Sequence, residues 1–339
     1  MTDSTALVTG GAGYIGSHVA WALRDAGWRV VVLDDFSTGR RGLAPPSARI
    51  VEGDVADGAL VRRLLAEERV EAVLHFAGSA VVPESVSDPL AYYRNNLSAG
   101  IELIRACLAG DVKRFIFSST AAVYGEPEEV PVPESAPPRP VNPYGHSKLM
   151  LEQVLRDVDR AHRFPYVALR YFNVAGADPA GRSGQSGPKS THLIKVACEV
   201  AAGLRKGMEI YGTDYDTPDG TCIRDYIHVT DLADAHLRAL EHLIAGGPSL
   251  TLNCGYGFGF SVREVLKVAQ QVAGRPIPAR EAPRRPGDPA RLVAEPGALK
   301  ERLGWRPRHD DLKTIVATAL AWERRRASEE RVEAGRQLP

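Results

Sequence analysis

The chain has 339 residues, of which 44% are hydrophobic and 25% are charged. This is the composition of an ordinary globular protein, with enough length for two fused units. Its 42 basic residues balance 42 acidic ones, which excludes a net field that would attract nucleic acid or an anionic membrane. We find no signal peptide, no apolar run of about 18 residues, and no metal or redox spacing among the four cysteines. These features predict a cytoplasmic chain without a metal site.

The first half of the chain alternates short apolar runs with amphipathic stretches. The runs predict strands at Ala6–Val8, Val30–Leu33, Ile50–Val51, Ala72–Phe76, Phe115–Phe117 and Tyr166–Leu169. The stretches predict helices at His18–Ala26, Leu60–Glu68, Leu97–Leu108 and Lys148–Val158. Strands that are buried on both faces and separated by helices are typical of right-handed βαβ units. The sequence therefore predicts the α/β class, with a Rossmann-type doubly wound parallel sheet.

Two long loops and a change of pattern divide the chain. Glu126–Pro143 is rich in proline and Gly176–Ser190 in glycine, serine and proline, and loops of this length in a compact domain are usually functional. After the start of the second loop, the alternation of strands and helices fades. The expected boundaries are 1–175 for the Rossmann-type domain, with 225–250 returning to it, and 176–224 with 251–339 for a smaller mixed α/β domain that binds the substrate.

A glycine-rich turn joins the first predicted strand to the first helix. It reads Thr9-Gly10-Gly11-Ala12-Gly13-Tyr14-Ile15-Gly16. A pyrophosphate at a helix N-terminus needs backbone N–H groups that no side chain obstructs. Gly10 suits the tight turn, Gly13 the approach of the phosphates, and Gly16 the contact of helix with strand. Tyr14 and Ile15 open the helix. A glycine pattern alone is a weak signal, but its place between strand and helix predicts a dinucleotide site.

Acidic and small residues end the neighbouring strands. Asp34 ends the second strand, where its carboxylate can accept hydrogen bonds from ribose hydroxyls and would repel a 2′-phosphate. NAD is therefore favoured over NADP, and we interpret the nearby Arg40 and Arg41 as solvated loop charges. The other candidate cofactor contacts here are Asp35, Asp54, Val55, Phe76, Ala77 and Gly78. Turn residues without a ligand would look the same, and both interpretations stay open for the two later strand ends.

Tyr144 and Lys148 are four residues apart in a predicted helix and therefore share one face. A tyrosine ordinarily titrates at about pH 10. A lysine ammonium group and a cationic nicotinamide ring beside the phenol would both favour the phenolate. Such a tyrosine can remove a proton from a sugar hydroxyl as hydride leaves the same carbon. Alone, the spacing is a common coincidence on helix surfaces, but its place after a dinucleotide site favours a catalytic pair.

Three hydroxyl side chains follow the predicted strand Phe115–Phe117, namely Ser118, Ser119 and Thr120. A hydroxyl at this edge of the sheet can hydrogen-bond the reacting sugar oxygen and relay its proton, and Thr120 is our candidate. Ser118 is placed among the cofactor contacts, although we favour the alternative that it only satisfies backbone groups at the strand end.

In this order, the features resemble the UDP-glucose 4-epimerase family of the extended short-chain dehydrogenase/reductase superfamily. The shared stretches cover nearly the whole length and are Leu7–Ser17 (LVTGGAGYIGS), Val73–Gly78, Pro89–Asn96 (PLAYYRNN), Phe115–Gly125, Asn142–Leu149 (NPYGHSKL), Leu169–Asn173 (LRYFN) and Thr217–Leu232 (TPDGTCIRDYIHVTDL). The resemblance implies tightly held NAD that is not consumed, and a homodimer. It implies that Tyr144 removes the C4 hydroxyl proton of a UDP-hexose, supported by Thr120 and Lys148. Asn95 and Tyr171 would contact the cofactor.

The resemblance also implies a UDP-sugar site in the second half of the chain. Its residues, beside Thr120 and Tyr144, are Asn173, His192, Leu193, Tyr211, Arg224, Arg285, Asp288 and Leu292. Two guanidinium groups, of Arg224 and Arg285, can clamp a diphosphate, and Asp288 can accept from a ribose hydroxyl. Each arginine alone is more often an exposed surface charge.

Three positions depart from the family pattern. Ala80 replaces a frequent lysine, His192 a frequent asparagine, and Leu292 a bulky tyrosine found in some relatives. The smaller Leu292 predicts room for the C2 substituent of an N-acetylhexosamine.

Several alternative functions stay open. Epimerases of UDP-GlcNAc and UDP-GalNAc, or of UDP-pentoses, use the same core chemistry. A nucleotide-sugar 4,6-dehydratase is disfavoured, because Ala121 and Ala122 stand where such enzymes carry acidic groups. A non-catalytic dinucleotide-sensing protein is disfavoured by the intact Tyr144 and Lys148 pair.

Overall fold

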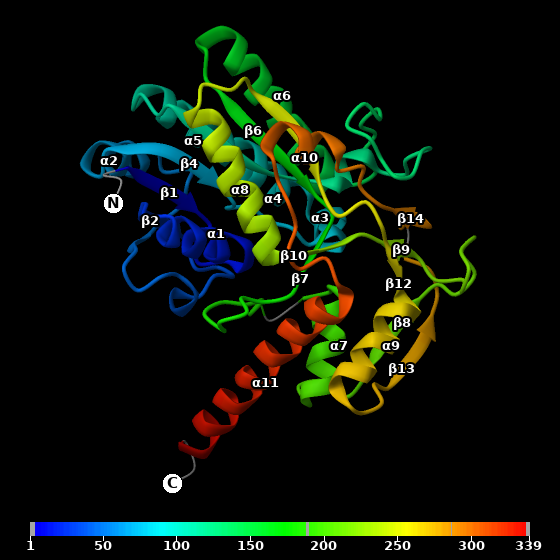
Figure 1. Cartoon of the computed structure of the whole chain (residues 1–339). Helices are drawn as coiled ribbons and strands as arrows, with labels where there is room; N and C mark the ends of the chain where they lie inside the picture. The colour runs from blue at the N-terminus through cyan, green and yellow to red at the C-terminus, as the bar shows by residue number, and fades with distance from the viewer. Residues whose placement is uncertain (1–3, 188–189, 286, 337–339) are drawn as a thin grey trace.

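A computed structural model describes residues 4–187, 190–285 and 287–336 of the chain. Its centre is a sheet of seven strands in the order β11-β6-β5-β4-β1-β2-β3 (Figure 1). The strands are β1 (Thr5–Thr9), β2 (Arg29–Asp34), β3 (Arg49–Glu52), β4 (Val70–His75), β5 (Arg114–Thr120), β6 (Tyr166–Tyr171) and β11 (Leu250–Cys254). All neighbouring strands pair in parallel. The predicted Rossmann-type parallel sheet is confirmed.

The strand order reverses between β1 and β4. β2 and β3 follow β1 on one side, whereas β5 and β6 follow β4 on the other. Ligands of open parallel sheets bind at such a reversal, beyond the carboxyl ends of the strands. The two central strands end here at Thr9 and His75, whose Oγ1 and Nδ1 atoms are hydrogen-bonded at 2.7 Å. This edge of the sheet is where the predicted site residues should meet.

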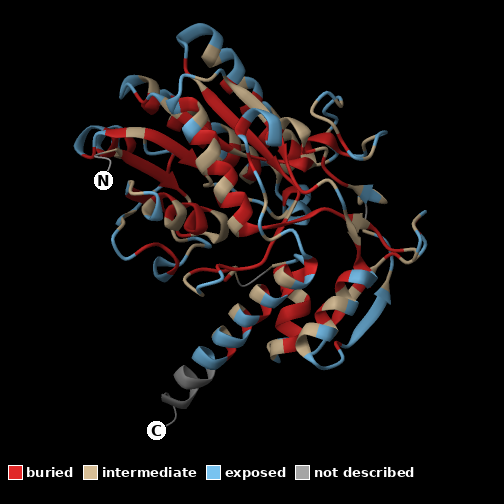
Figure 2. Ribbon diagram, in the orientation of Figure 1, coloured by how far each residue is buried: buried red, intermediate tan, exposed pale blue. Residues whose placement is uncertain are grey.

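Helices cover both faces of the sheet. Alternate residues of β1 enter different cores: Ala6 and Val8 pack with α1 and α8, whereas Leu7 packs with α2, α5 and α6. These helices are α1 (Tyr14–Asp25), α2 (Gly58–Glu67), α5 (Ala99–Ala109), α6 (Pro143–His162) and α8 (Val229–Ile244). Figure 2 shows the strands buried between the two helical layers. The doubly wound arrangement is thereby confirmed.

Short helical turns connect these elements. They are η1 (Arg41–Leu43), α3 (Val82–Ser87), α4 (Pro89–Tyr92), the π-helical η2 (Tyr93–Ser98) and the 3₁₀ turn η3 (Ala121–Tyr124). The PLAYYRNN stretch forms α4 and most of η2, and the chain then continues directly into α5.

The second half of the chain adds smaller sheets and four further helices. The strands are β7 (Asn173–Ala175) paired with β10 (Tyr226–His228), β8 (Met208–Tyr211) paired with β13 (Ala279–Ala282), and β9 (Ile223–Arg224) between β12 (Phe260–Ser261) and β14 (Arg291–Leu292). The helices are α7 (Leu193–Ala202), α9 (Val262–Ala273), α10 (Gly297–Leu303) and α11 (Leu312–Arg336). α7, α9 and α11 pack against one another beside the main sheet (Figure 1). Among the described helices, none has the length and apolar character to cross a membrane.

Candidate active site

The glycine-rich turn between β1 and α1 leaves no space for a side chain at positions 10 and 16. A Cβ at Gly10 would lie 2.6 Å from the backbone nitrogen of Ala77, and a Cβ at Gly16 would collide with the Gly10 carbonyl oxygen. Gly10 also has a φ of 68°, which favours glycine. Gly13 is the N-cap of α1 and gives the helix no side-chain cap. The first amide groups of α1, from Tyr14 onward, can therefore bind an anion, and the turn fits the diphosphate of a dinucleotide.

Asp34 at the end of β2 holds this turn in place. Its Oδ2 accepts from the N–H of Ala12 and its Oδ1 from that of Phe36, both at 2.9 Å. The side chain is buried, and burial raises the pKa of its carboxyl group. A carboxylate oxygen has further lone pairs, so Asp34 can still accept from a ribose hydroxyl. Arg41 donates to Glu52 at 2.5 Å and lies 4.3 Å from the centroid of the Phe36 ring, which supports its interpretation as a loop charge.

The other acidic candidates form hydrogen bonds within their own turns. Asp35 Oδ1 accepts from the backbone N–H of Ser37 at 2.9 Å and from its hydroxyl at 2.7 Å. Asp54 Oδ1 accepts from the N–H of Ala56 at 2.8 Å, and Val55 beside it is buried. These contacts explain the residues as turn formers, and their contact with a cofactor stays a prediction.

Tyr14 and Ile15 open α1 in two different environments. The Tyr14 hydroxyl donates to the carbonyl oxygen of Gly176 at 2.7 Å, which ties α1 to the loop after β7. Ile15 is half-buried and packs against the core on this face of the sheet. Their predicted cofactor contacts stay predictions.

The structure brings Thr120, Tyr144 and Lys148 together at the carboxyl edge of the sheet. Thr120 ends β5, where its hydroxyl accepts from the N–H of Ala122 at 3.1 Å. The same hydroxyl lies near enough to the Tyr144 phenol, at the start of α6, to lower the pKa of that phenol. Lys148, one turn further along α6, donates from Nζ to the carbonyl oxygen of Ser118 at 3.0 Å. Its Nζ lies 5.0 Å from the centroid of the Phe117 ring. The predicted reacting groups therefore lie side by side on β5 and α6.

The pKa of Tyr144 differs from what the sequence led us to expect. Burial raises the pKa of Tyr144, and the hydrogen bond from Thr120 only partly offsets this. Burial lowers the pKa of Lys148 to about 8. We expected the lysine ammonium to acidify the phenol. In the structure that ammonium donates to the Ser118 carbonyl, and desolvation of the phenol dominates.

Asn96, which sequence reasoning did not select, connects the end of β4 to α6. Its Oδ1 accepts from the N–H of Ser79 at 2.8 Å, and its Nδ2 donates to the Ser147 hydroxyl at 3.0 Å. The predicted Asn95 donates to the Ser79 hydroxyl at 2.8 Å. A Cβ at Gly78 would lie 2.9 Å from Asn96 Oδ1, so the Phe-Ala-Gly turn passes directly beside this amide. The sequence signal that could have identified Asn96 is its place directly after the predicted Asn95 in η2.

Tyr171, a predicted cofactor contact, is held by His236 of α8. The Tyr171 hydroxyl lies 2.9 Å from His236 Nε2, and His236 Nδ1 lies 2.8 Å from the Leu232 carbonyl oxygen. Burial lowers the pKa of His236 to about 4, so the ring is neutral near pH 7. Because Nδ1 must then donate to Leu232, Nε2 accepts from the tyrosine. The Phe76 ring, at 4.9 Å between centroids, packs on the same imidazole.

Arg224 and Asp288 are brought together in the smaller part of the chain. Arg224 ends β9 and is buried, with Nη2 at 3.5 Å from Asp288 Oδ1 and Nη1 donating to the Ile223 carbonyl at 2.9 Å. Leu292 is the β14 partner of Arg224 in the parallel register. Three of the predicted substrate residues therefore share one small sheet and its flank.

Tyr211 and Arg285 form a second pair. The Arg285 guanidinium carbon lies 3.8 Å from the centroid of the Tyr211 ring, and the Tyr211 hydroxyl donates to Glu209. A guanidinium stacked on an aromatic face keeps its N–H groups directed outward for an anionic ligand.

The three remaining substrate candidates lie at element ends. Asn173 begins β7, where its N–H donates to the Asp225 carbonyl at 2.9 Å. His192 is the N-cap of α7, and its Nδ1 lies 2.9 Å from Gln185 Nε2. Leu193 begins α7 and is half-buried. Their roles toward a ligand stay predictions.

Leu292 connects this part of the chain to the reacting groups. It packs on a cluster that includes Ala121, Tyr124 and Phe172, together with Leu149 of α6. Ala121 follows Thr120 directly, and Leu149 follows Lys148. The Arg224 sheet therefore lies against the strand end and the helix that carry the predicted chemistry.

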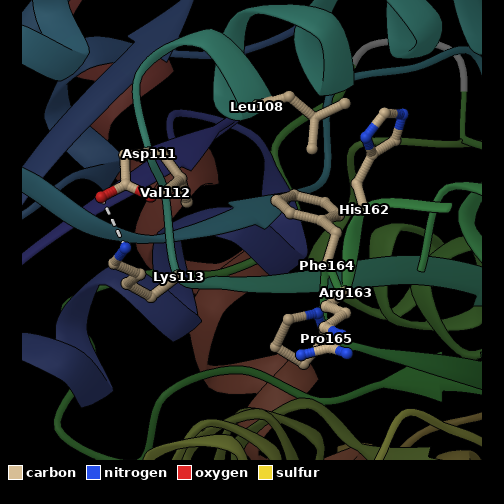
Figure 3. Close-up of a pocket in the computed structure, with 8 residues that line it drawn as sticks. All are labelled: Leu108, Asp111, Val112, Lys113, His162, Arg163, Phe164 and Pro165. Atoms are coloured by element: carbon tan, nitrogen blue, oxygen red, sulfur yellow. Dashed lines mark ion pairs between the residues drawn. The ribbon is translucent and has the colours of Figure 1, made fainter. Parts of the chain in front are cut away.

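A polar hollow elsewhere on the surface is separate from this site. Its volume is about 540 Å³, and it lies beside the amino ends of β5 and β6, with Lys113 Nζ paired to Asp111 Oδ2 at 2.5 Å (Figure 3). Its lining residues are Leu108, Asp111, Val112, Lys113, His162, Arg163, Phe164 and Pro165. The predicted site residues of β5 and β6 are at the opposite, carboxyl ends of these strands.

Comparison with known proteins agrees with this geometry. Residues 6–255 match the model of the NAD dependent epimerase/dehydratase family. A UDP-glucose 4-epimerase of Azospirillum brasilense is 60% identical over 329 residues, which cover 96% of this chain and 94% of that protein. A crystal structure of UDP-glucose 4-epimerase from Brucella ovis in complex with NAD is 45% identical, with a TM-score of 0.92, covering 95% of this chain and 98% of that one.

A second solved structure adds a nucleotide. It is UDP-glucose 4-epimerase from Bifidobacterium longum in complex with NAD⁺ and UDP, 40% identical, with a TM-score of 0.90, covering 95% of this chain and 98% of that one. The glycine-rich turn, the Thr120, Tyr144 and Lys148 group and these near full-length matches agree, and the chain belongs to the NAD dependent epimerase/dehydratase family, among its UDP-glucose 4-epimerases.

Proposed function

We propose that the protein is an isomerase, a UDP-glucose 4-epimerase, that interconverts UDP-glucose and UDP-galactose with a bound NAD. The observation that carries this proposal is the placement of Thr120 at the end of β5 and of Tyr144 and Lys148 in the first turns of α6, with Lys148 hydrogen-bonded to Ser118, at the edge where the strand order reverses. Relatives that carry this name match almost the whole chain. A phenol beside a lysine, at the edge where open parallel sheets bind their ligands, supports this proposal.

The chain provides a site for NAD along this edge. The amide groups at the start of α1 would hold the diphosphate, and Asp34 a ribose. The further residues proposed to line the cofactor are Tyr14, Ile15, Asp35, Asp54, Val55, Phe76, Ala77, Gly78, Asn95, Ser118, Tyr144, Lys148 and Tyr171. When bound, NAD supplies a hydride acceptor and donor for the sugar carbon.

The protein's own groups would manage the proton. Tyr144, as the phenolate, would take the proton of the C4 hydroxyl, with Thr120 hydrogen-bonded to both oxygens. Lys148 would keep a positive charge beside the phenolate while it donates to the Ser118 carbonyl. After the 4-keto sugar has turned about its link to UDP, Tyr144 would return the proton to the oxygen. The turned sugar then carries the opposite configuration at C4.

The groups that bind the substrate would come from the smaller part of the chain. Arg224 and Arg285 would bind the diphosphate of UDP, and Asp288 a ribose hydroxyl. Asn173, His192, Leu193 and Tyr211 would complete the nucleotide site, and Leu292 would face the sugar.

The decisive experiment uses purified protein, UDP-galactose and a coupled assay for UDP-glucose. Tyr144→Phe removes the proton-transfer group and keeps the ring, so turnover should fall below detection while NAD still co-purifies. Tyr93→Phe, in the neighbouring turn, is the matched control and should keep turnover. Normal turnover by Tyr144→Phe would falsify the assignment of the proton to this phenol.

We also propose a homodimer. Three helices that contact one another, α3, α4 and α6, expose Val86, Leu90 and Met150, and Val86 and Leu90 are 64% and 78% exposed. Large apolar side chains gathered on one surface mark interfaces. The mass in solution, by light scattering, is the direct check, and a monomer at micromolar concentration would contradict this proposal.

The remaining proposals concern domain boundaries and cell compartment. We assign 1–175 to the NAD-binding unit and let the returning segment run from 225 to 254, because β11 ends there and pairs with β6. The other residues after 175 form the UDP-sugar unit. We infer the reducing cytoplasm because Cys107, Cys198, Cys222 and Cys254 are all free and buried. Fractionation of cells that express the protein tests this location.

A further inference from the structure

Helix α6 carries three polar side chains at intervals of four residues, Tyr144, Lys148 and Glu152, so all three lie on one face. The mechanism uses the first two and gives no role to the third. Glu152 is 0% exposed. A carboxylate taken out of water is costly unless it is paired and hydrogen-bonded, so its partners indicate what it holds in place.

Glu152 joins α6 to two neighbouring strands of the sheet. Arg170 in β6 donates from Nε to Oε1 at 3.0 Å and from Nη2 to Oε2 at 2.6 Å. Ser119 in β5 donates its hydroxyl to Oε1 at 2.5 Å. Ser119 and Arg170 are opposite each other in the parallel register. The two-point contact of a guanidinium with a carboxylate fixes orientation as well as distance, so α6 is held at one defined place on β5 and β6.

Consecutive residues of β5 all contact this face of α6. Ser118 accepts from Lys148 and Ser119 donates to Glu152, and the Thr120 hydroxyl lies near enough to Tyr144 to lower the pKa of the phenol. The middle contact is the one reinforced by an ion pair. Because strand and helix are each rigid, a shift of α6 at Glu152 would also move the Tyr144 phenol relative to Thr120.

Arg170 also holds the turn that follows Thr120. Its Nη1 donates to the Tyr124 hydroxyl at 2.8 Å, and its guanidinium carbon lies 4.9 Å from the centroid of the Tyr124 ring. Tyr124 in turn donates to Asn253 Oδ1 at 2.7 Å. One buried cation therefore restrains both sides of the reacting pair, the helix with Tyr144 and the turn after Thr120.

We propose that Glu152 and Arg170 are positioning residues. Their ion pair, together with the hydrogen bond from Ser119 to Glu152, keeps the Tyr144 phenol beside the Thr120 hydroxyl during proton transfer. The proposal rests on the proposed function, because this position matters only if Tyr144 transfers the proton. The ion pair acts through α6 and β5, so its loss should affect kcat more than substrate binding.

Glu152→Gln tests the proposal, because it keeps the shape of the side chain and removes its charge. We expect kcat for UDP-galactose to fall about 100-fold while KM changes less than about threefold, and NAD to remain bound. The hydrogen bond from Thr120 lowers the pKa of Tyr144. Weakening that bond should raise this pKa and move the rising limb of the kcat profile to higher pH.

Glu323→Gln is the matched control. Glu323 in α11 is 2% exposed and accepts from Lys195 of α7 at 2.7 Å. Like Glu152, it therefore belongs to a buried ion pair, but one that lies outside the catalytic edge of the sheet. Both variants should unfold at a lower temperature, but only Glu152→Gln should lower kcat and shift the pH profile. If Glu152→Gln loses stability and keeps both the wild-type kcat and the wild-type profile, its role is purely structural and the proposal is overturned.

Ser119→Ala provides a second test if Glu152→Gln does not fold, since it removes the contact to β5 and keeps the ion pair. It should lower kcat about 10-fold with the same direction of pH shift, and an unchanged kcat and profile would contradict the proposal. Tyr144→Phe separates the test of the proposed function from the test of the positioning role. Turnover by that variant contradicts the proposed function, whereas its inactivity beside fully active Ser119→Ala or Glu152→Gln contradicts only the positioning role.

Discussion

Lys148 carries its ammonium group into a buried site, where desolvation lowers its pKa to about 8. The group is therefore still mostly protonated at pH 7 and supplies positive charge beside Tyr144. The phenol itself is harder to ionise in the protein than in water, because burial raises its pKa more than the hydrogen bond from Thr120 lowers it. At the scale of single residues, the site keeps the proton on Tyr144 until further positive charge approaches it.

Leu292 gives a prediction about substrate choice. It packs against the cluster that contains Ala121 and is the β14 partner of Arg224, so we predict that its size limits the space for the sugar. We expect turnover of UDP-GlcNAc beside UDP-galactose. Leu292→Tyr should reduce turnover of UDP-GlcNAc at least about tenfold and change that of UDP-galactose little, because even one methylene too many in a pocket costs about 1–3 kcal/mol.

Leu292→Met keeps the volume and is the control for this substitution. It should preserve both activities in a parallel assay of the two substrates. A wild-type turnover of UDP-GlcNAc below the detection limit ends the idea of an N-acetylhexosamine substrate.

At the scale of elements, α6 decides the geometry of the site. It begins at Pro143, and Asn142 caps it by accepting from the N–H of Gly145 at 2.9 Å. Proline at the first helical position has no N–H to leave unbonded, and an asparagine cap satisfies one of the free amides. The helix therefore starts one residue before Tyr144, which places the phenol in its first turn and Glu152 two turns further along.

Asn142→Ala should destabilise the protein by about 1 kcal/mol, the usual effect of removing an N-cap. Asn142→Asp retains an oxygen for the Gly145 amide and should stay close to the wild type. Urea unfolding of the three proteins measures the difference. An alanine variant as stable as the aspartate variant would show that the cap does not stabilise this helix.

At the scale of the whole molecule, several imidazoles are buried in the neutral form. Burial lowers the pKa of His18 and His236 to about 4 and that of His75 and His228 to about 3. An unfolded histidine titrates at about 6.5. Below that pH the unfolded chain binds protons that the folded chain does not, so stability falls as the pH decreases from about 6.5 toward 4.

We expect the free energy of unfolding to be clearly lower at about pH 5.5 than at about pH 7.5, with each buried histidine costing up to about 1.4 kcal/mol per pH unit below its unfolded pKa. Asp225, whose pKa is raised to about 6 by burial, acts in the opposite direction and offsets part of this loss. Urea unfolding at the two pH values checks the sign. Equal stability at both values would contradict the prediction.

The sequence by itself determined the local features. Its apolar runs were long enough for buried parallel strands. Its glycines marked the turn where β1 meets α1, because a residue with a Cβ at position 10 or 16 would collide with the backbone there. The spacing of Tyr144 and Lys148 was sufficient to place both on one face of α6. These properties depend on neighbours within a few residues, and therefore they can be predicted from the chain alone.

The tertiary structure decided what depends on contacts between distant segments. It put β11 into the main sheet beside β6, placed Asn96 and His236 next to the predicted site, and buried Tyr144 deeply enough to raise its pKa. It also paired Glu152 with Arg170 across α6 and β6. Burial and ion pairing depend on the positions of residues far apart in the chain, which no local pattern of a single sequence records.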